Sequence, residues 1–112
     1  MFRRGNKDEY EGWWEAVDGS PSPDLHGKIE WEPSADGGTE IDLLVSNLGV
    51  PDGAEVDVVC EGNVLLRAPV TGGKARHIIK SSEGHTVPDL AGKTVELRYG
   101  STVLATTVLE PD

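Results

Sequence analysis

The sequence predicts an all-β protein: a seven-stranded Greek-key β-sandwich with an irregular N-terminal arm and an internal strand-hairpin repeat. From Gly27 onward, apolar and polar residues alternate with a period of two, and Gly, Pro, Asn and Asp interrupt the alternation at short intervals. Half-buried strands joined by tight turns have this pattern, and several of them in succession favour a sandwich or Greek-key barrel. No segment places apolar residues at helical spacing over ten or more positions.

Each predicted strand directs one set of residues toward the core. In chain order these sets are Ile29 and Trp31 in KIEWE; Ile41, Leu43 and Val45 in EIDLLVS; Val56, Val58 and Cys60 in EVDVVCE; Val64, Leu66 and Ala68 in NVLLRAP; Ala75, His77 and Ile79 in ARHIIK; Val95, Leu97 and Tyr99 in TVELRYG; and Val103, Ala105 and Thr107 in TVLATTVLE. In ARHIIK the other register, with Ile78 facing inward, stays open.

Two segments resemble each other: VPDGAEVDVVCEGNVLLRAPV at 50–70 and VPDLAGKTVELRYGSTVLATTVL at 87–109. Both open with Val-Pro-Asp, continue into an alternating strand, turn at a glycine and return through Val-Leu. Matched turn residues and matched alternation specify matched register. We therefore expect 54–70 and 93–109 to form equivalent hairpins related by an approximate twofold.

The two Val-Pro-Asp turns place Asp52 and Asp89 at related positions, where they could bind a cation. Pro at the first turn position and Asp bonded to nearby backbone also make good turns without any ligand. The turn explanation is favoured, and cation binding remains its alternative.

Residues 1–26 differ in composition from the predicted β-sandwich domain, residues 27–112. They are charged and aperiodic, and they end in DGSPSPDLHG, where Pro21 and Pro23 disfavour both helix and ladder pairing. We therefore expect an irregular arm followed by one folded domain.

The arm holds four of the six aromatic residues of the chain: Phe2, Tyr10, Trp13 and Trp14. Tyr and Trp are enriched at the energetically dominant positions of protein interfaces. These four residues are the predicted partner-binding residues, for another protein or for a second copy of the chain. The alternative is an arm that folds back over an edge of its own sandwich.

The chain carries 20 acidic and 10 basic residues, a formal net charge of −10. This charge opposes binding to nucleic acid and to anionic membranes, both of which gain affinity from Lys and Arg. An acidic surface serves solubility or the recognition of a cationic partner. An acidic inhibitor or decoy is therefore the alternative function.

The run from HGKIEWEP at 26–33 through TVLATTVLEP at 102–111 resembles the Greek-key sandwiches of copper-zinc superoxide dismutases and chordin-type domains in its strand spacing, Gly-rich turns and Val-Pro-Asp element. The resemblance implies a fold. Those dismutases hold metals with a His-x-His strand, further histidines, an Asp and a stapling disulfide. Here His26, His77 and His85 are isolated and Cys60 has no partner, so the resemblance carries over no metal site.

Catalytic patterns are weak throughout the chain. Ser81, Ser82 and His85 lie too close together on one turn to form a hydrolase triad, and no glycine-rich phosphate loop opens a helix. We expect no enzyme activity, no cofactor and no small-molecule substrate, with a small metalloenzyme as the least favoured alternative.

The expected function is a non-catalytic binding module, a structural or accessory component of a larger assembly. The first residues include Arg3 and Arg4 without a following apolar run, and no stretch approaches the roughly 18 apolar residues of a membrane helix. The single cysteine, Cys60, fits a reducing compartment. These features favour a cytoplasmic location.

Overall fold

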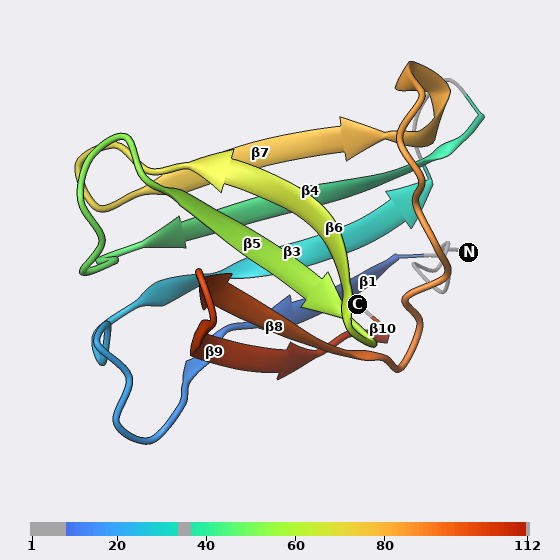
Figure 1. Ribbon diagram of the computed structural model, residues 1–112. Helices are drawn as coiled ribbons and strands as arrows, with labels where there is room; N and C mark the ends of the chain where they lie inside the picture. The colour runs from blue at the N-terminus through green and yellow to red at the C-terminus, as the bar shows by residue number, and fades with distance from the viewer. Residues whose placement is uncertain (1–8, 34–36, 112) are drawn as a thin grey trace, which may run out of the picture.

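The computed structural model describes residues 9–33 and 37–111, which form two antiparallel β-sheets packed face to face (Figure 1). The first sheet has the order β10 (Glu110–Pro111), β1 (Tyr10–Trp13), β3 (His26–Pro33), β4 (Thr39–Ser46) and β7 (Ala75–Lys80). The second has the order β2 (Glu15–Ala16), β9 (Thr102–Val108), β8 (Thr94–Tyr99), β5 (Glu55–Cys60) and β6 (Asn63–Pro69). A short 3-10 helix, η1 (Ser81–Glu83), follows β7. The predicted β-sandwich is confirmed.

The chain crosses between the two sheets after β1, β2, β4, β6, β7 and β9. The strands β5 and β6 form a hairpin in the second sheet, while β7 contacts β6 and pairs with β4 in the first. The spatial order β4, β7, β6, β5 is a Greek key. All seven predicted strands are present as β3 to β9, and the described residues add β1, β2 and β10.

The core lies between the sheets and is filled by the inward-facing aliphatic residues of both. Ile29, Leu43, Val56 and Leu97 are completely buried, as their alternation predicted. The sequence left open whether Ile78 or Ile79 of β7 faces the core. In the structure Ile79 is buried and Ile78 is exposed.

The hairpins β5–β6 and β8–β9 have the same register. Glu55 faces Pro69 at the open end of the first hairpin, as Thr94 faces Val108 in the second. Each hairpin has a bulge at the same place, after the fourth pair from this end. The two strand pairs therefore present equivalent positions to the core.

These bulges change which residues face inward near each turn. Leu65 in β6 and Leu104 in β9 are the extra residues, and the alternation reverses beyond such a residue. The prediction that Val64 faces the core is therefore wrong: its exposed fraction is 47%. Tyr99 is also exposed, because it ends β8 at the turn rather than between the sheets.

The prediction of an irregular arm is wrong for residues 10–16. Tyr10–Trp13 pairs with both β3 and β10, and Glu15–Ala16 pairs with β9 in the other sheet. Gly12 permits this, since a Cβ there would lie 2.5 Å from the Thr107 Oγ1. Much of the predicted arm is thus part of the sandwich, whereas residues 1–8 lie outside the described residues.

The two hairpins meet where Val58 of β5 pairs with Leu97 of β8, and both side chains are fully buried. Replacing either residue by Ala should lower the free energy of unfolding by about 2 to 4 kcal/mol, because methyl groups are lost and a cavity remains. Urea denaturation measures this loss. Val108→Ala, at an exposed valine, is the control, with an expected change below about 0.5 kcal/mol. Losses that small at both buried positions would contradict their assignment to the core.

Candidate functional site: the groove beside Trp13

The structure separates the four residues predicted to bind a partner. Trp14 lies in the core with an exposed fraction of 5%, so its prediction as a contact residue is wrong. Tyr10 is half-buried and packs against Trp31, whereas Trp13 is 52% exposed. Phe2 lies outside the described residues. Only Trp13 among the four offers a largely exposed aromatic surface in the described part of the chain.

Strand alternation explains this difference between neighbouring tryptophans. Tyr10 and Gly12 face inward from β1, so Glu11 and Trp13 face outward from the first sheet. The strand then ends, and the Trp14 backbone N–H donates to the Gly27 carbonyl at 2.9 Å as the chain passes to the second sheet. This passage turns the Trp14 ring into the space between the sheets.

Two neighbours hold the exposed Trp13 ring in place. The His26 ring lies 5.7 Å away between centroids, tilted by 36°, and the Lys28 Nζ lies 5.5 Å from the Trp13 ring centroid. A cation over an indole face is attracted by the ring quadrupole. Both contacts favour this position of the ring, and a side chain that already prefers one position loses less entropy on association.

Trp13 borders a groove on the outer surface of the first sheet, with a volume of about 320 Å³. We call it the Trp13 groove; the residues that line it are Trp13, His26, Gly27, Lys28, Leu44, Val45, Ser46 and Lys74. Leu44 is 45% exposed, so a large aliphatic side chain contributes to the surface of the groove. The groove thus combines an apolar floor with two lysines and no carboxylate among the lining residues named.

Basic and apolar side chains continue from the groove across the outer face of the first sheet. Trp13 pairs with Lys28, Lys28 with Leu44, and Leu44 with Arg76, so the four side chains form one row over β1, β3, β4 and β7. These rows run across the strands because directly opposite residues project to the same face. The row therefore carries one aromatic, one aliphatic and two cationic side chains.

The neighbouring row is acidic. Glu11 pairs with Glu30, and Glu30 pairs with Asp42, which places three carboxylates side by side. Like charges directly opposite one another are destabilising in a sheet, and Lys28 offsets part of this repulsion with an ion pair to Glu30 at 3.6 Å. The outer face of the first sheet is thus divided into a basic, apolar row and an acidic row.

The other candidate residues lie apart from this groove. Cys60 is free and buried, and burial raises the pKa of its thiol. Ser81 opens η1, where its Oγ accepts a hydrogen bond from the Thr39 N–H at 3.0 Å, and His85 is exposed in the following connection. Within residues 9–33 and 37–111, no three His, Cys, Asp or Glu side chains are grouped to hold a metal ion.

Both Val-Pro-Asp carboxylates accept backbone hydrogen bonds. Asp89 Oδ1 accepts from the Ala91 N–H at 2.9 Å within its own turn, whereas Asp52 Oδ1 accepts from the Gly72 N–H at 2.8 Å in the turn between β6 and β7. Asp89 therefore has the turn role expected of it. Asp52 instead connects two turns that are distant in sequence.

Sequence reasoning missed Leu44, Lys28 and Lys74 as groove residues. One signal was present: Leu44 is a large aliphatic residue at an outward position of EIDLLVS, between Asp42 and Ser46. The remaining residues become neighbours only through strand pairing, which the sequence alone does not specify.

No protein-family model matches the chain, and no curated protein matches it either. In the described part of the chain, no helix is both long enough and apolar enough to cross a membrane.

Proposed function

We propose that this protein is a non-catalytic β-sandwich binding module, a structural or accessory component of a larger assembly, and that it docks a protein partner at the Trp13 groove. The observation that carries the proposal is an exposed tryptophan, in contact with His26 and Lys28, beside the exposed Leu44. An aromatic residue of this kind is the usual centre of an interface hot spot.

The groove suggests the chemistry of the partner. Its apolar floor favours an inserted apolar side chain, and Lys28 and Lys74 favour carboxylates around that side chain. A second copy of the chain offers such a combination, because Ile78 is exposed and pairs with Asp42 on the outer face. Self-association is therefore one form of the proposed docking.

The acidic row supports the alternative function, an inhibitor or decoy for a cationic partner. Such a partner would contact Glu11, Glu30 and Asp42 rather than the groove. The two functions differ in which substitution weakens binding: Glu30→Gln for the alternative, and Trp13→Ala for the groove. Binding to the acidic row would also weaken steeply with added salt.

The test compares affinity capture by the wild-type chain, Trp13→Ala and Tyr99→Ala, followed by affinity measurement on the captured partner. Trp13→Ala should weaken binding by about 2 to 4 kcal/mol, as expected for a hot-spot aromatic. Its free energy of unfolding should change little, because more than half of the side chain is exposed. Sedimentation of the same variants measures self-association.

Tyr99→Ala is the matched control, since Tyr99 is an exposed aromatic residue on the other sheet. It should bind as the wild type does. Equal affinity of Trp13→Ala and Tyr99→Ala for the partner, or for a second copy of the chain, would contradict docking at the groove.

A further inference from the structure

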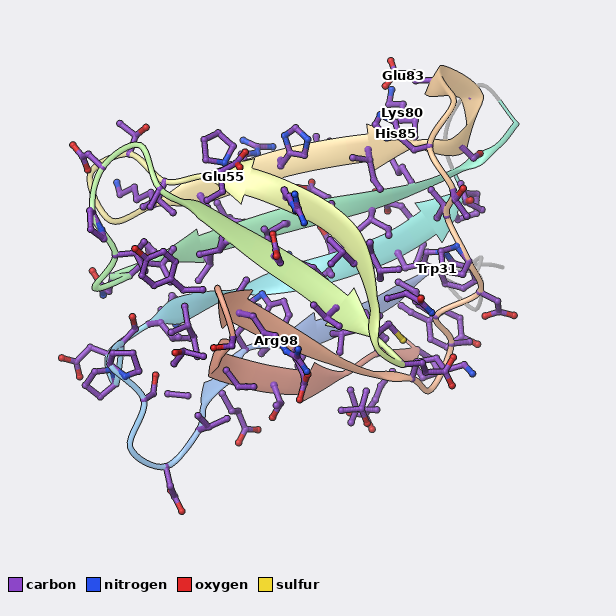
Figure 2. All side chains as sticks on the ribbon, viewed as in Figure 1. Trp31, Glu55, Lys80, Glu83, His85 and Arg98 are labelled. Atoms are coloured by element: carbon purple, nitrogen blue, oxygen red, sulfur yellow. The ribbon has the colours of Figure 1, made fainter. Side chains whose placement is uncertain are left out.

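A second cavity, of about 300 Å³, opens at the far end of β3 from the Trp13 groove. It is lined by Tyr10, Trp31, Glu32, Pro33, Thr39, Asp89 and Ala91, and we call it the Tyr10–Trp31 pocket. Figure 2 shows Trp31 at this end of β3, beside the connection that leads from η1 to β8. Its volume is at the lower end of the range typical of small-ligand sites.

Two aromatic rings form one side of the pocket. Tyr10 of β1 is paired with Trp31 of β3, and the ring centroids are 5.5 Å apart with the planes inclined at 53°. Both half-buried residues are among those that line the pocket. The Trp31 Nε1 is buried and has no hydrogen-bond acceptor among the described residues.

The remaining chemistry of the pocket is acidic. Glu32 and Asp89 are among its lining residues, and the lining includes no Lys, Arg or His among the residues described. The chain as a whole carries a net charge of −10. A cation entering the pocket would therefore meet a negative potential.

Other carboxylates surround Glu32. Burial raises the pKa of Glu32 above its ordinary value, and the negative charges of Glu30, Glu40, Glu9 and Asp42 raise it further. A positive charge close to Glu32 would therefore stabilise its ionised carboxylate.

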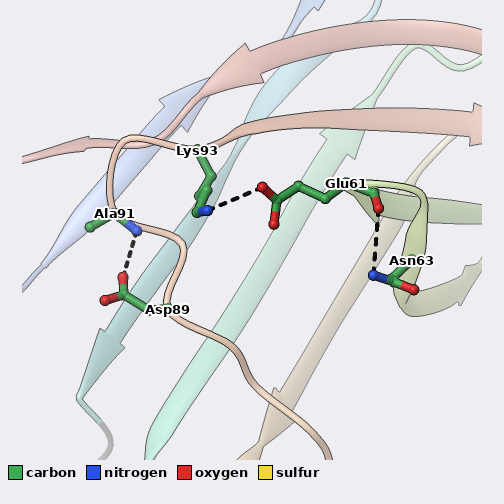
Figure 3. A network of polar contacts seen from close by, with 5 residues as sticks. All are labelled: Glu61, Asn63, Asp89, Ala91 and Lys93. Carbon is green, nitrogen blue, oxygen red and sulfur yellow. Dashed lines mark hydrogen bonds and ion pairs between the residues drawn. The ribbon is translucent and has the colours of Figure 1, made fainter.

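A hydrogen bond and an ion pair hold the turn that brings Asp89 and Ala91 to the pocket. Figure 3 shows Asp89 closing its turn through the Ala91 N–H, and Lys93 reaching Glu61 in the β5–β6 turn, with 3.1 Å between the Lys93 Nζ and the Glu61 Oε2. Leu90, between them, is 1% exposed. The ion pair also directs the Lys93 ammonium toward Glu61.

We propose that the Tyr10–Trp31 pocket binds an organic cation, a substituted ammonium or a guanidinium group, with the cation against the two rings and near the carboxylates of Glu32 and Asp89. Aromatic faces attract such cations, and partial removal from water strengthens the attraction. A hard metal ion would instead require a shell of oxygen ligands, which the aromatic rings cannot supply. This site is separate from the Trp13 groove and does not depend on the function proposed for it.

Choline is a suitable probe, and the tryptophan indole N–H resonances in ¹H–¹⁵N NMR spectra report its binding. Choline should shift the Trp31 resonance in a saturable manner. Its neutral isostere 3,3-dimethyl-1-butanol, which has the same shape without the charge, and sodium chloride at equal ionic strength should not.

Tyr10→Leu removes one ring and should weaken choline binding roughly 10-fold, whereas Tyr10→Phe retains the ring and should bind as the wild type does. Glu32→Gln retains size and removes charge, and should weaken binding severalfold. Thermal unfolding establishes that each variant is folded, and Glu32→Gln keeps the test decisive if Tyr10→Leu does not fold.

Residues 1–8 contain Arg3, Arg4 and Lys7, so a chain lacking them is titrated in parallel. Choline binding that appears only in the shortened chain would also support a pocket for organic cations. In that case Arg3, Arg4 or Lys7 competes with choline in the full chain. The proposal is overturned if neither chain gives a saturable shift, if the neutral isostere shifts Trp31 equally, or if Glu32→Gln and Tyr10→Leu bind as tightly as the wild type.

Discussion

Replacing Trp14 by Ala is expected to lower the free energy of unfolding by about 3 to 5 kcal/mol, because it empties a large site in a closely packed core. The Trp14 side chain is 5% exposed and belongs to the same cluster as Ile29 and Leu104. It also occupies the point where the chain passes from the first sheet to the second. Equilibrium denaturation with urea, monitored by circular dichroism, measures the loss.

Two control variants make this result specific. Trp13→Ala, one residue earlier but on the surface, should change stability by no more than about 0.5 kcal/mol. Trp14→Phe should lose much less than Trp14→Ala, since it fills most of the site and removes an indole N–H that has no acceptor among the described residues. Similar stabilities for Trp13→Ala and Trp14→Ala would show that the assignment of these two side chains to opposite faces is incorrect.

Gly27→Ala is expected to cost about 3 kcal/mol or more, through backbone strain and steric overlap together. Gly27 has a φ of 150°, and a Cβ there would lie 2.1 Å from the Leu44 carbonyl oxygen and 2.6 Å from the Val45 Cα. These are backbone atoms of the paired strand β4, so they cannot move aside without breaking the ladder. Denaturation of the purified variant, or its failure to fold, is the measurement.

Gly53→Ala separates the two contributions. Gly53 also has a positive φ, 86°, but a Cβ there would meet no atom within 4 Å. Only the conformational cost of about 1 kcal/mol is then expected. If the two glycine variants lose equal stability, the close approach of β3 and β4 at Gly27 is not the cause.

The sequence predicted the strands that have both sufficient length and regular alternation. In β4, for example, Ile41, Leu43 and Val45 alternate with polar or outward positions and are all buried. Period-two alternation is a local property, so it identifies such strands without knowledge of their partners. The same property left the choice between Ile78 and Ile79 open, because two adjacent isoleucines satisfy either register.

The features that the sequence did not predict depend on pairing. Tyr10–Trp13 is short and contains a glycine, and Glu15–Ala16 has only two residues. Both become strands only because β3, β9 and β10 pair with them. Val64 was assigned to the wrong face because a bulge at Leu65 cannot be seen in the alternation of one strand.

The candidate site illustrates the same limit. Trp13 was predicted as a contact residue from its residue type and is exposed, but its neighbours Lys28 and Leu44 come from two other strands. Trp14 was predicted for the same reason and is buried. Composition identified an aromatic segment, and only the path of the backbone determined which ring faces solvent.

The pairing of β1 with β10 has a consequence for the kinetics of folding. Tyr10 lies opposite Pro111, so this ladder closes a loop of about 100 residues. The hairpins β5–β6 and β8–β9 close short loops and lose little entropy when they form early, and β1 joins β3 through a loop of intermediate length. The strand β10, in contrast, must find β1 at the other end of the chain. Such dependence on distant contacts is typical of β-sandwiches that fold in milliseconds to seconds. The edge strand β10 is therefore among the last elements to become ordered, and the residues that line the Trp13 groove and the Tyr10–Trp31 pocket all lie outside it.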